Sequence, residues 1–169
     1  MPTLLWFRRD LRLHDLPPLL EAPPTGTRSS PASYWIRGWR SRRAPPTPAV
    51  PRRFPARTLR RLEGRLLITR GRPEERIPVL CKQIDATEVH VSADFSPFGV
   101  RRDAAVKAAL DEAGATLQPT GSPYLVAPGR VTKDDGTPPY KVFTPFLAKW
   151  REVGWRKPAP SASATVSWI

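Results

Sequence analysis

The chain has 169 residues, of which 28 are Lys or Arg, 15 are Asp or Glu, and 40% are hydrophobic. This length usually makes one domain, and the hydrophobic share excludes a wholly disordered chain. No apolar run reaches the length of a membrane span, and we expect no secretory signal. One cysteine and two histidines exclude a disulfide framework, argue against a protein-built zinc site and indicate a reducing, cytoplasmic setting.

Ten of the thirteen charges in the formal net charge of +13 come from one segment. Between Ala22 and Leu62 there is no acidic residue, whereas ten arginines lie from Arg28 to Arg61. Leaving those ten out gives 18 basic against 15 acidic residues, a balance of +3. The rest of the chain therefore has the charge of an ordinary near-neutral domain, and the arginines, if exposed, predict non-specific binding of polyanions.

The first predicted elements are short apolar runs and segments of helical spacing. A buried strand is predicted at 3–7, and a helix at 11–22 whose first turn must hold two adjacent prolines. A second buried strand is predicted at 64–69. A proline followed by two glutamates is typical of a helix start and predicts a helix at 73–84.

The remaining elements continue the alternation of strand and helix. Alternating apolar residues predict a strand at 88–92, and a strong helical pattern at 101–113 is closed by Gly114. A short strand is predicted at 115–118, and a last helix runs through Trp150 with Thr144 as its N-cap.

Strands that alternate with helices through short connections predict an α/β domain with a Rossmann-like parallel sheet. Ligands of such sheets bind beyond the carboxyl ends of the strands. The candidate site residues that follow predicted strands there are Arg8, Arg9, Asp10, Asp94, Phe95 and Phe98. No glycine-rich phosphate-binding loop is present, which counts against an unrelated nucleotide-binding domain.

Four segments resemble the N-terminal part of the DNA photolyase/cryptochrome family. They are LLWFRRDLRLHDLPPL at 4–19, GRLLITRGRPEE, HVSADFSPFGVRRD, and SPYLVAPGRVTKDDGTPPYKVFTPFLAKW, and they occur in the family's order. WFRRDLR and YKVFTPF are specific when they are found together. The resemblance covers residues 1–22 and about 58–169, and it is strongest to the bacterial photolyases that repair cyclobutane pyrimidine dimers.

The resemblance implies an α/β domain at 1–157 that holds an antenna chromophore, and an interdomain linker that starts at 158–169. In the family a second, helical domain binds FAD and takes the flipped-out pyrimidine dimer of UV-damaged DNA into its pocket. Reduced, photoexcited FAD then donates an electron that splits the pyrimidine dimer. Because this chain has no counterpart of the FAD domain, we expect it to be inactive by itself and to contain no catalytic residue.

The resemblance also assigns roles to the candidate site residues. It implies that Arg8, Arg9 and Asp10 organise either the antenna pocket or the domain interface. Asp94, Phe95 and Phe98 would form a wall on which a flat chromophore stacks. Folate-binding members carry Asn-Glu where this chain has Phe98-Gly99, which favours a deazaflavin over a folate as the antenna.

Residues 23–57 resemble nothing in the family, although both flanks do. The family has its second strand and next helix here, and we expect both to be lost, since five prolines between residues 45 and 55 exclude a helix. Reading 23–39 displaced by two bases permits Glu-Val-Val-Ala-Cys-Phe-Val-Leu-Asp-Pro, and reading 46–57 displaced by one base permits a helical pattern. We therefore interpret the segment as translated out of frame; the alternative is a genuine Arg/Pro-rich insertion.

Several conspicuous residues receive structural interpretations. Cys81 is predicted to be a buried, inert thiol, and His90 a structural residue of a strand. The charged start of the helix at 101–103 is predicted to be solvated, and Phe143 and Phe146 are predicted to pack between domains. The alternative function is a basic nucleic-acid-binding α/β module that uses Arg28–Arg61 as a tether.

Overall fold

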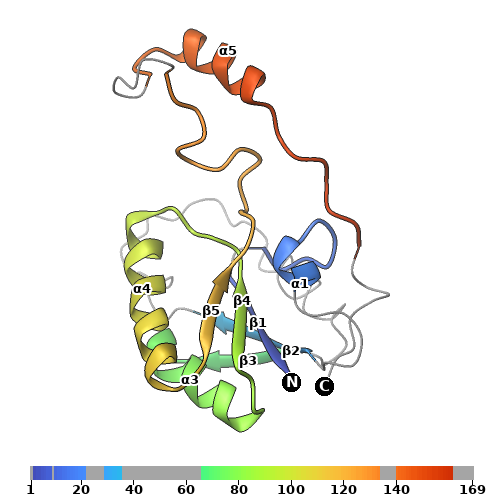
Figure 1. Cartoon of the computed structure of the whole chain (residues 1–169), viewed down its shortest axis with the longest axis vertical. Helices are drawn as coiled ribbons and strands as arrows, with labels where there is room; N and C mark the ends of the chain where they lie inside the picture. Colours follow the sequence, from blue (N-terminus) through green and yellow to red (C-terminus); the bar gives the residue numbers. More distant parts are fainter. Residues whose placement is uncertain (1, 9, 22–28, 36–65, 134–139, 162–169) are drawn as a thin grey trace, which may run out of the picture.

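A five-stranded parallel sheet forms the centre of the protein, seen in the computed structural model of Figure 1. The structure describes residues 2–8, 10–21, 29–35, 66–133 and 140–161. The strands are β1 (Thr3–Phe7), β2 (Ser29–Trp35), β3 (Leu67–Arg70), β4 (Glu88–Val91) and β5 (Thr116–Pro119), in the order β3-β2-β1-β4-β5. Every neighbouring pair is parallel, which confirms the predicted α/β fold class.

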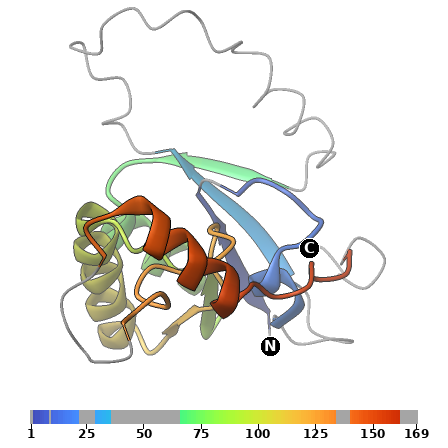
Figure 2. The same ribbon diagram turned by 90° about the horizontal axis from the view of Figure 1, so that it is seen from above.

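The helices are α1 (Pro17–Glu21), α3 (Pro73–Gln83), α4 (Pro97–Glu112) and α5 (Phe143–Val153). In Figure 2, α1 lies on the opposite side of the sheet from α3 and α4. The alternation of β1 explains these layers, because successive side chains of a strand point to opposite faces. All five residues of β1 are buried, as expected for a strand that is covered on both faces.

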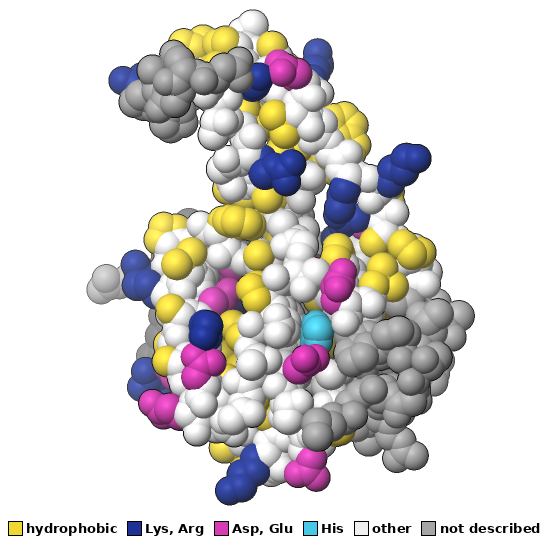
Figure 3. Space-filling view, in the orientation of Figure 1, with side chains coloured by type: hydrophobic (Ala, Val, Ile, Leu, Met, Phe, Trp, Pro, Cys, Tyr) yellow, Lys and Arg dark blue, Asp and Glu magenta, His cyan; other side chains and the backbone are white. Residues whose placement is uncertain are grey.

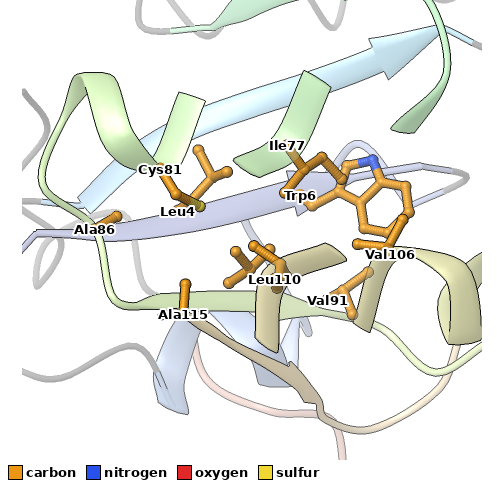
Figure 4. Packing of buried hydrophobic residues seen from close by; sticks show 10 residues of the cluster. Leu4, Trp6, Ile77, Cys81, Ala86, Val91, Val106, Leu110 and Ala115 are labelled. Atoms are coloured by element: carbon orange, nitrogen blue, oxygen red, sulfur yellow. The ribbon is translucent and has the colours of Figure 1, made fainter. Parts of the chain in front are cut away.

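The larger core lies between the sheet and the α3–α4 pair. Leu4 and Trp6 of β1 meet Ile77 of α3 and Leu110 of α4 there, with Cys81, Ala86, Val89, Val91, Val106 and Ala115 completing the cluster. Figure 4 shows the Trp6 indole between Ile77 and Val106. On the other face, Leu5 and Phe7 pack against Leu16 and Leu19.

The expectation that the second strand is lost was wrong. Ser29–Trp35 forms β2, whose residues pair with β1 from Thr3 to Phe7 and with β3 from Leu67 to Arg70. A strand between two parallel neighbours needs only backbone N–H and C=O groups to pair, so composition does not exclude it. Pro31 lies opposite Leu5, although proline brings no N–H group to a ladder. The helix expected to be lost falls within 36–65, outside the described residues.

Helix boundaries differ from the prediction at three places. The first helix begins at Pro17 rather than at residue 11, since Asp15 has a left-handed φ of 51° that no helix accommodates. α4 begins four residues earlier than predicted, with Ser96 as its N-cap and Pro97 in its first turn. α5 begins after Val142 instead of using Thr144 as its cap. No helix among the described residues is long and apolar enough to cross a membrane.

Candidate functional site

Polar side chains join the ends of β1 and β4 at the carboxyl edge of the sheet. Arg8 follows β1, and its guanidinium donates a hydrogen bond to the backbone carbonyl of Ser92, which follows β4. The Ser92 hydroxyl in turn donates to the carboxylate of Asp10. Asp10 and Ser92 are both buried. The two central strands are therefore locked together where a ligand of such a sheet would bind.

The first turns of α4 add a buried chain of charges. Arg8 pairs with Asp103 at 2.5 Å, and Arg102 pairs with Asp103 at 2.8 Å and with Asp94 at 3.2 Å. The side chains of Arg102 and Asp94 are only 6% and 7% exposed. Burial raises the pKa of the Asp103 carboxyl, although the Arg102 guanidinium acts in the opposite direction. Two guanidiniums thus hold two carboxylates in place, as buried charges require.

Both arginines of this charge network lie over the Trp6 ring. The guanidinium carbons of Arg8 and Arg102 lie 4.8 and 5.2 Å from the ring centroid, within the range of cation–π attraction. The indole Nε1 is buried and has no hydrogen-bond partner. A buried donor without an acceptor is uncommon, so this site has hydrogen-bonding capacity that the described residues do not use.

An aromatic surface lies beside the network. Phe95, Phe98 and Tyr124 are 41%, 51% and 41% exposed. The rings of Phe95 and Tyr124 meet edge to face, with centroids 6.3 Å apart, and the guanidinium carbon of Arg102 lies 5.7 Å from the Phe98 centroid. Large aromatic side chains usually bury most of their area in a folded protein, so these rings are suited to cover a flat apolar ligand.

Gly99 leaves room for the Asp94 carboxylate. A Cβ added at Gly99 would lie 2.2 Å from the Asp94 Cγ, which is far inside van der Waals contact. Asp94 has little freedom to withdraw, because its other interactions are the Arg102 ion pair and a 3.0 Å hydrogen bond from the Ser96 backbone N–H. The position of Asp94 therefore depends on the absence of a side chain at residue 99.

The structure brings most of the predicted site residues to one edge. Arg8, Asp10 and Asp94 belong to the network, and Phe95 and Phe98 to the aromatic surface. Arg9 lies outside the described residues. Whether these residues bind a chromophore stays a prediction.

The candidate site residues did not include Arg102, Asp103 and Tyr124, nor Ser92, which the strand order alone places at the same edge. The start of the helix at 101–103 was predicted to be solvated, but Arg102 is 8% exposed. The buried residues of α4 are Gly99, Arg102, Val106 and Leu110. Their spacing of three and four is that of one helix face, and it was readable from the sequence once the helix was started at Pro97.

Cys81 and His90, two residues of types that often carry chemistry, both lie in the protein interior. Cys81 is buried, and burial raises its thiol pKa to about 11, so the reactive thiolate is scarce near neutral pH. His90 is also buried, with its Nε2 3.3 Å from the Glu88 carboxylate. The predicted burial of the Cys81 thiol is confirmed, whereas the structural role of His90 stays a prediction. Among the described residues, no group of three or more His, Cys, Asp or Glu is placed to hold a metal ion.

The family profile described as DNA photolyase matches residues 3–163 of the chain. The chain belongs to the DNA photolyase family. The deoxyribodipyrimidine photo-lyase of Thermus thermophilus is 30% identical over 175 residues, which cover 95% of this chain and 36% of the relative. Photolyases as a family bind FAD and an antenna chromophore and act on UV-damaged DNA.

Two solved structures share the fold. A cryptochrome of Synechocystis sp. superposes with a TM-score of 0.77 at 22% identity, over 99% of this chain and 37% of the cryptochrome. An archaeal photolyase of Sulfolobus tokodaii, whose structure holds two FAD molecules, gives a TM-score of 0.71 at 19% identity, over 100% and 38% of the two chains. The chain thus spans little more than a third of the photolyases and cryptochromes that it matches.

Proposed function

We propose that the carboxyl edge of this sheet is the antenna-chromophore site of a photolyase. The observation that carries the proposal is the exposed wall of Phe95, Phe98 and Tyr124 beside a buried, fully paired charge network. Such a surface offers π-faces for a planar ring system next to groups whose positions are already fixed.

Within this proposal, the chromophore is a flavin-like ring, with deazaflavin favoured over folate. Folate-binding photolyases carry Asn-Glu where this chain has Phe98-Gly99, and the Asp94 carboxylate occupies the space that a side chain at 99 would need. The Sulfolobus tokodaii structure, described as holding two FAD molecules with the implication of a novel light-harvesting cofactor, supports a flavin-like antenna on the same fold.

We further propose that the chain serves as the α/β part of a cytoplasmic enzyme that repairs pyrimidine dimers. In that enzyme residues 1–157 form the antenna domain, and residues from 158 begin the linker to the FAD-binding part. The FAD would supply the electron that opens the cyclobutane ring. This chain's part would be to hold the antenna close enough to pass on its excitation.

Chromophore titration tests the site directly. The purified chain is titrated with a deazaflavin, with FMN and with a methenyl-tetrahydrofolate, and absorption and fluorescence polarisation are recorded. We expect saturable binding of the deazaflavin, weaker binding of FMN and none of the folate. Phe98→Ala should weaken deazaflavin binding about tenfold, since a stacked ring loses its partner.

The control is Phe143→Ala, which removes another largely exposed ring from α5, outside the site. It should leave deazaflavin binding unchanged. Absence of saturable binding by every chromophore, or equal losses in the two variants, would overturn the antenna proposal.

A second candidate function is non-specific polyanion binding by the arginines between Arg28 and Arg61. The sequence favours it, because this segment supplies ten of the 28 basic residues and no acidic one between Ala22 and Leu62. Binding of double-stranded DNA should then fall steeply as salt rises, and replacing the ten arginines by glutamine should abolish that dependence. An unchanged salt slope would exclude the tether.

A further inference from the structure

The α5 helix stands away from the α/β body. None of its residues is buried. Phe143 is 70% exposed, and the residues that flank the helix, Val142 and Trp155, are 63% and 55% exposed. Figure 1 shows α5 carried at the top of two long connections, and Figure 3 shows hydrophobic side chains gathered over it. The orientation of α5 is therefore set by its connections, because no described core holds it.

Both connections return to the same short segment, Asp15–Pro17. On the incoming side, Gly121 packs so closely on Pro17 that an added Cβ would lie 2.8 Å from the proline Cγ. On the outgoing side, one oxygen of Asp15, Oδ1, accepts the Ala159 backbone N–H at 2.8 Å and the Arg156 guanidinium at 2.6 Å. Gly121 before α5 and Arg156 and Ala159 after it thus contact the same segment, Asp15–Pro17; we call α5 with these two contacts the arch, and the contacts its incoming and outgoing feet.

Hydrogen bonds to its backbone hold Asp15 in one conformation. Asp15 has a φ of 51°, a left-handed conformation that aspartate and asparagine tolerate better than most residues. The Arg12 guanidinium donates two hydrogen bonds, of 3.0 and 2.8 Å, to the backbone carbonyl of Asp15. The Asp15 backbone is therefore held in the conformation in which its carboxylate contacts Arg156 and Ala159.

Only a few residues separate the end of α5 from Arg156, and these residues contact the helix. The ring of Trp155 packs against that of Trp150 of α5, with centroids 5.2 Å apart and ring planes tilted by 34°, and the Gly154 N–H donates to the Trp150 carbonyl at 3.2 Å. Arg156 follows directly. A rigid turn thus links the end of the helix to the guanidinium that Asp15 holds.

We propose that Asp15 is a clasp that fixes the orientation of α5 relative to the α/β body. Closed, the clasp presents the exposed apolar side chains of α5 in one direction. Open, it loses the contacts of Asp15 with Arg156 and Ala159, while Gly121 still packs on Pro17. This device does not depend on chromophore binding or on any partner.

Spin-label distances test the clasp in the full chain. Glu112→Cys on α4 and Arg151→Cys on α5 place two labels on exposed positions, while Cys81 stays unlabelled because it is buried with a raised pKa. We expect one narrow distance distribution that broadens when Asp15→Asn is added. Asparagine keeps the left-handed turn but loses the charge, so the variant removes the ion pair with Arg156 and weakens the clasp without disturbing its backbone.

A second variant and a second measurement complete the test. Arg156→Gln, at a half-exposed position far from the core, should broaden the distribution as Asp15→Asn does, and both should speed hydrogen exchange of the Ala159 amide about tenfold. The control, Arg72→Gln, removes another exposed ion pair, to Glu74 at 2.7 Å, and should change neither measurement. A distribution that is equally broad before and after Asp15→Asn, or an unchanged Ala159 exchange rate, would overturn the clasp.

Discussion

The α/β body is held together by buried apolar side chains, whereas the α5 arch is held by polar contacts near the surface. In the body, Leu110, Val106 and Val91 are completely buried, and two clusters of apolar side chains fill both faces of the sheet. In the arch, α5 has no buried residue, and its outgoing foot rests on hydrogen bonds to one carboxylate. Burial of apolar area is a large, non-directional contribution, whereas one half-exposed ion pair is a small, directional one.

The difference teaches where stability and orientation reside in this molecule. The body should unfold as one cooperative unit, because β1 contributes side chains to the core clusters on both faces of the sheet. The arch should lose its orientation without unfolding the body, because α5 contributes no buried residue to either core cluster. Substitutions in the two regions should therefore separate global stability from the placement of α5.

The largest expected effect separates the two regions directly. Leu110→Ala removes a fully buried side chain and should lower the free energy of unfolding by about 4 kcal/mol. Phe143→Ala removes a larger side chain that is 70% exposed and should change it by less than about 0.5 kcal/mol. Urea unfolding followed by circular dichroism measures both. Similar losses would mean that α5 belongs to the same cooperative unit as the body.

The charge network should rank next. Arg102→Gln leaves Asp94 and Asp103 with less positive charge around them and should destabilise the body by about 3 kcal/mol, since a buried carboxylate loses its partner. Arg72→Gln, whose guanidinium is 71% exposed, should cost little. Thermal unfolding of the two variants compares them. Equal stabilities would show that the network at the carboxyl edge is solvated.

A smaller effect is expected at Gly99. Gly99→Ala forces the Asp94 carboxylate aside and should lower stability by about 2 kcal/mol through overpacking. At Gly114 a Cβ would meet nothing within 4 Å, but the φ of 74° makes Gly114→Ala a matched control for backbone strain alone, at about 1 kcal/mol. Binding of the deazaflavin should suffer only in Gly99→Ala. The proposal that Asp94 belongs to the site fails if the two variants bind it equally.

The smallest expected effect is the pH dependence of the contacts that Asp15 makes with Arg156 and Ala159. The Ala159 N–H and then the Arg156 guanidinium hold the pKa of Asp15 below its ordinary value of 3.8. A lowered carboxyl pKa stabilises the closed clasp above 3.8, and this contribution disappears as the pH falls through the pKa of the closed form. Carboxyl titration by NMR should show the Asp15 pKa moving up toward 3.8 in Arg156→Gln. An unchanged titration would mean that Arg156 does not face Asp15 in solution.

Much of the body was predictable because its elements carry local signals. The apolar run at 3–7, the proline that opens α3 and the alternation at 88–91 each specify an element over a few residues, and the structure has β1, α3 and β4 there. The edge that would bind a ligand followed from the parallel order of the strands alone. Arg8, Asp10 and Asp94 were assigned to that edge by their places after strands.

Other features depend on partners that are distant in the sequence. Ser29–Trp35 carries a proline and no apolar run, so no local pattern predicts a strand, and β2 exists through its pairing with β1 and β3. Pairing needs only backbone groups, which every residue but proline supplies in full. The out-of-frame interpretation of 23–57 stays a prediction for resequencing of the coding DNA.

The sequence by itself determined the family, the α/β class and the edge of the sheet at which the candidate site residues lie, because motifs and periodicity are local properties of the chain. Only the tertiary structure decided that Arg102 is buried between Asp94 and Asp103, and that Asp15 meets Ala159 across 144 residues. Ion pairs and hydrogen bonds of this kind have no sequence period. They form where folding has already brought the groups together, which is why their partners are visible only in three dimensions.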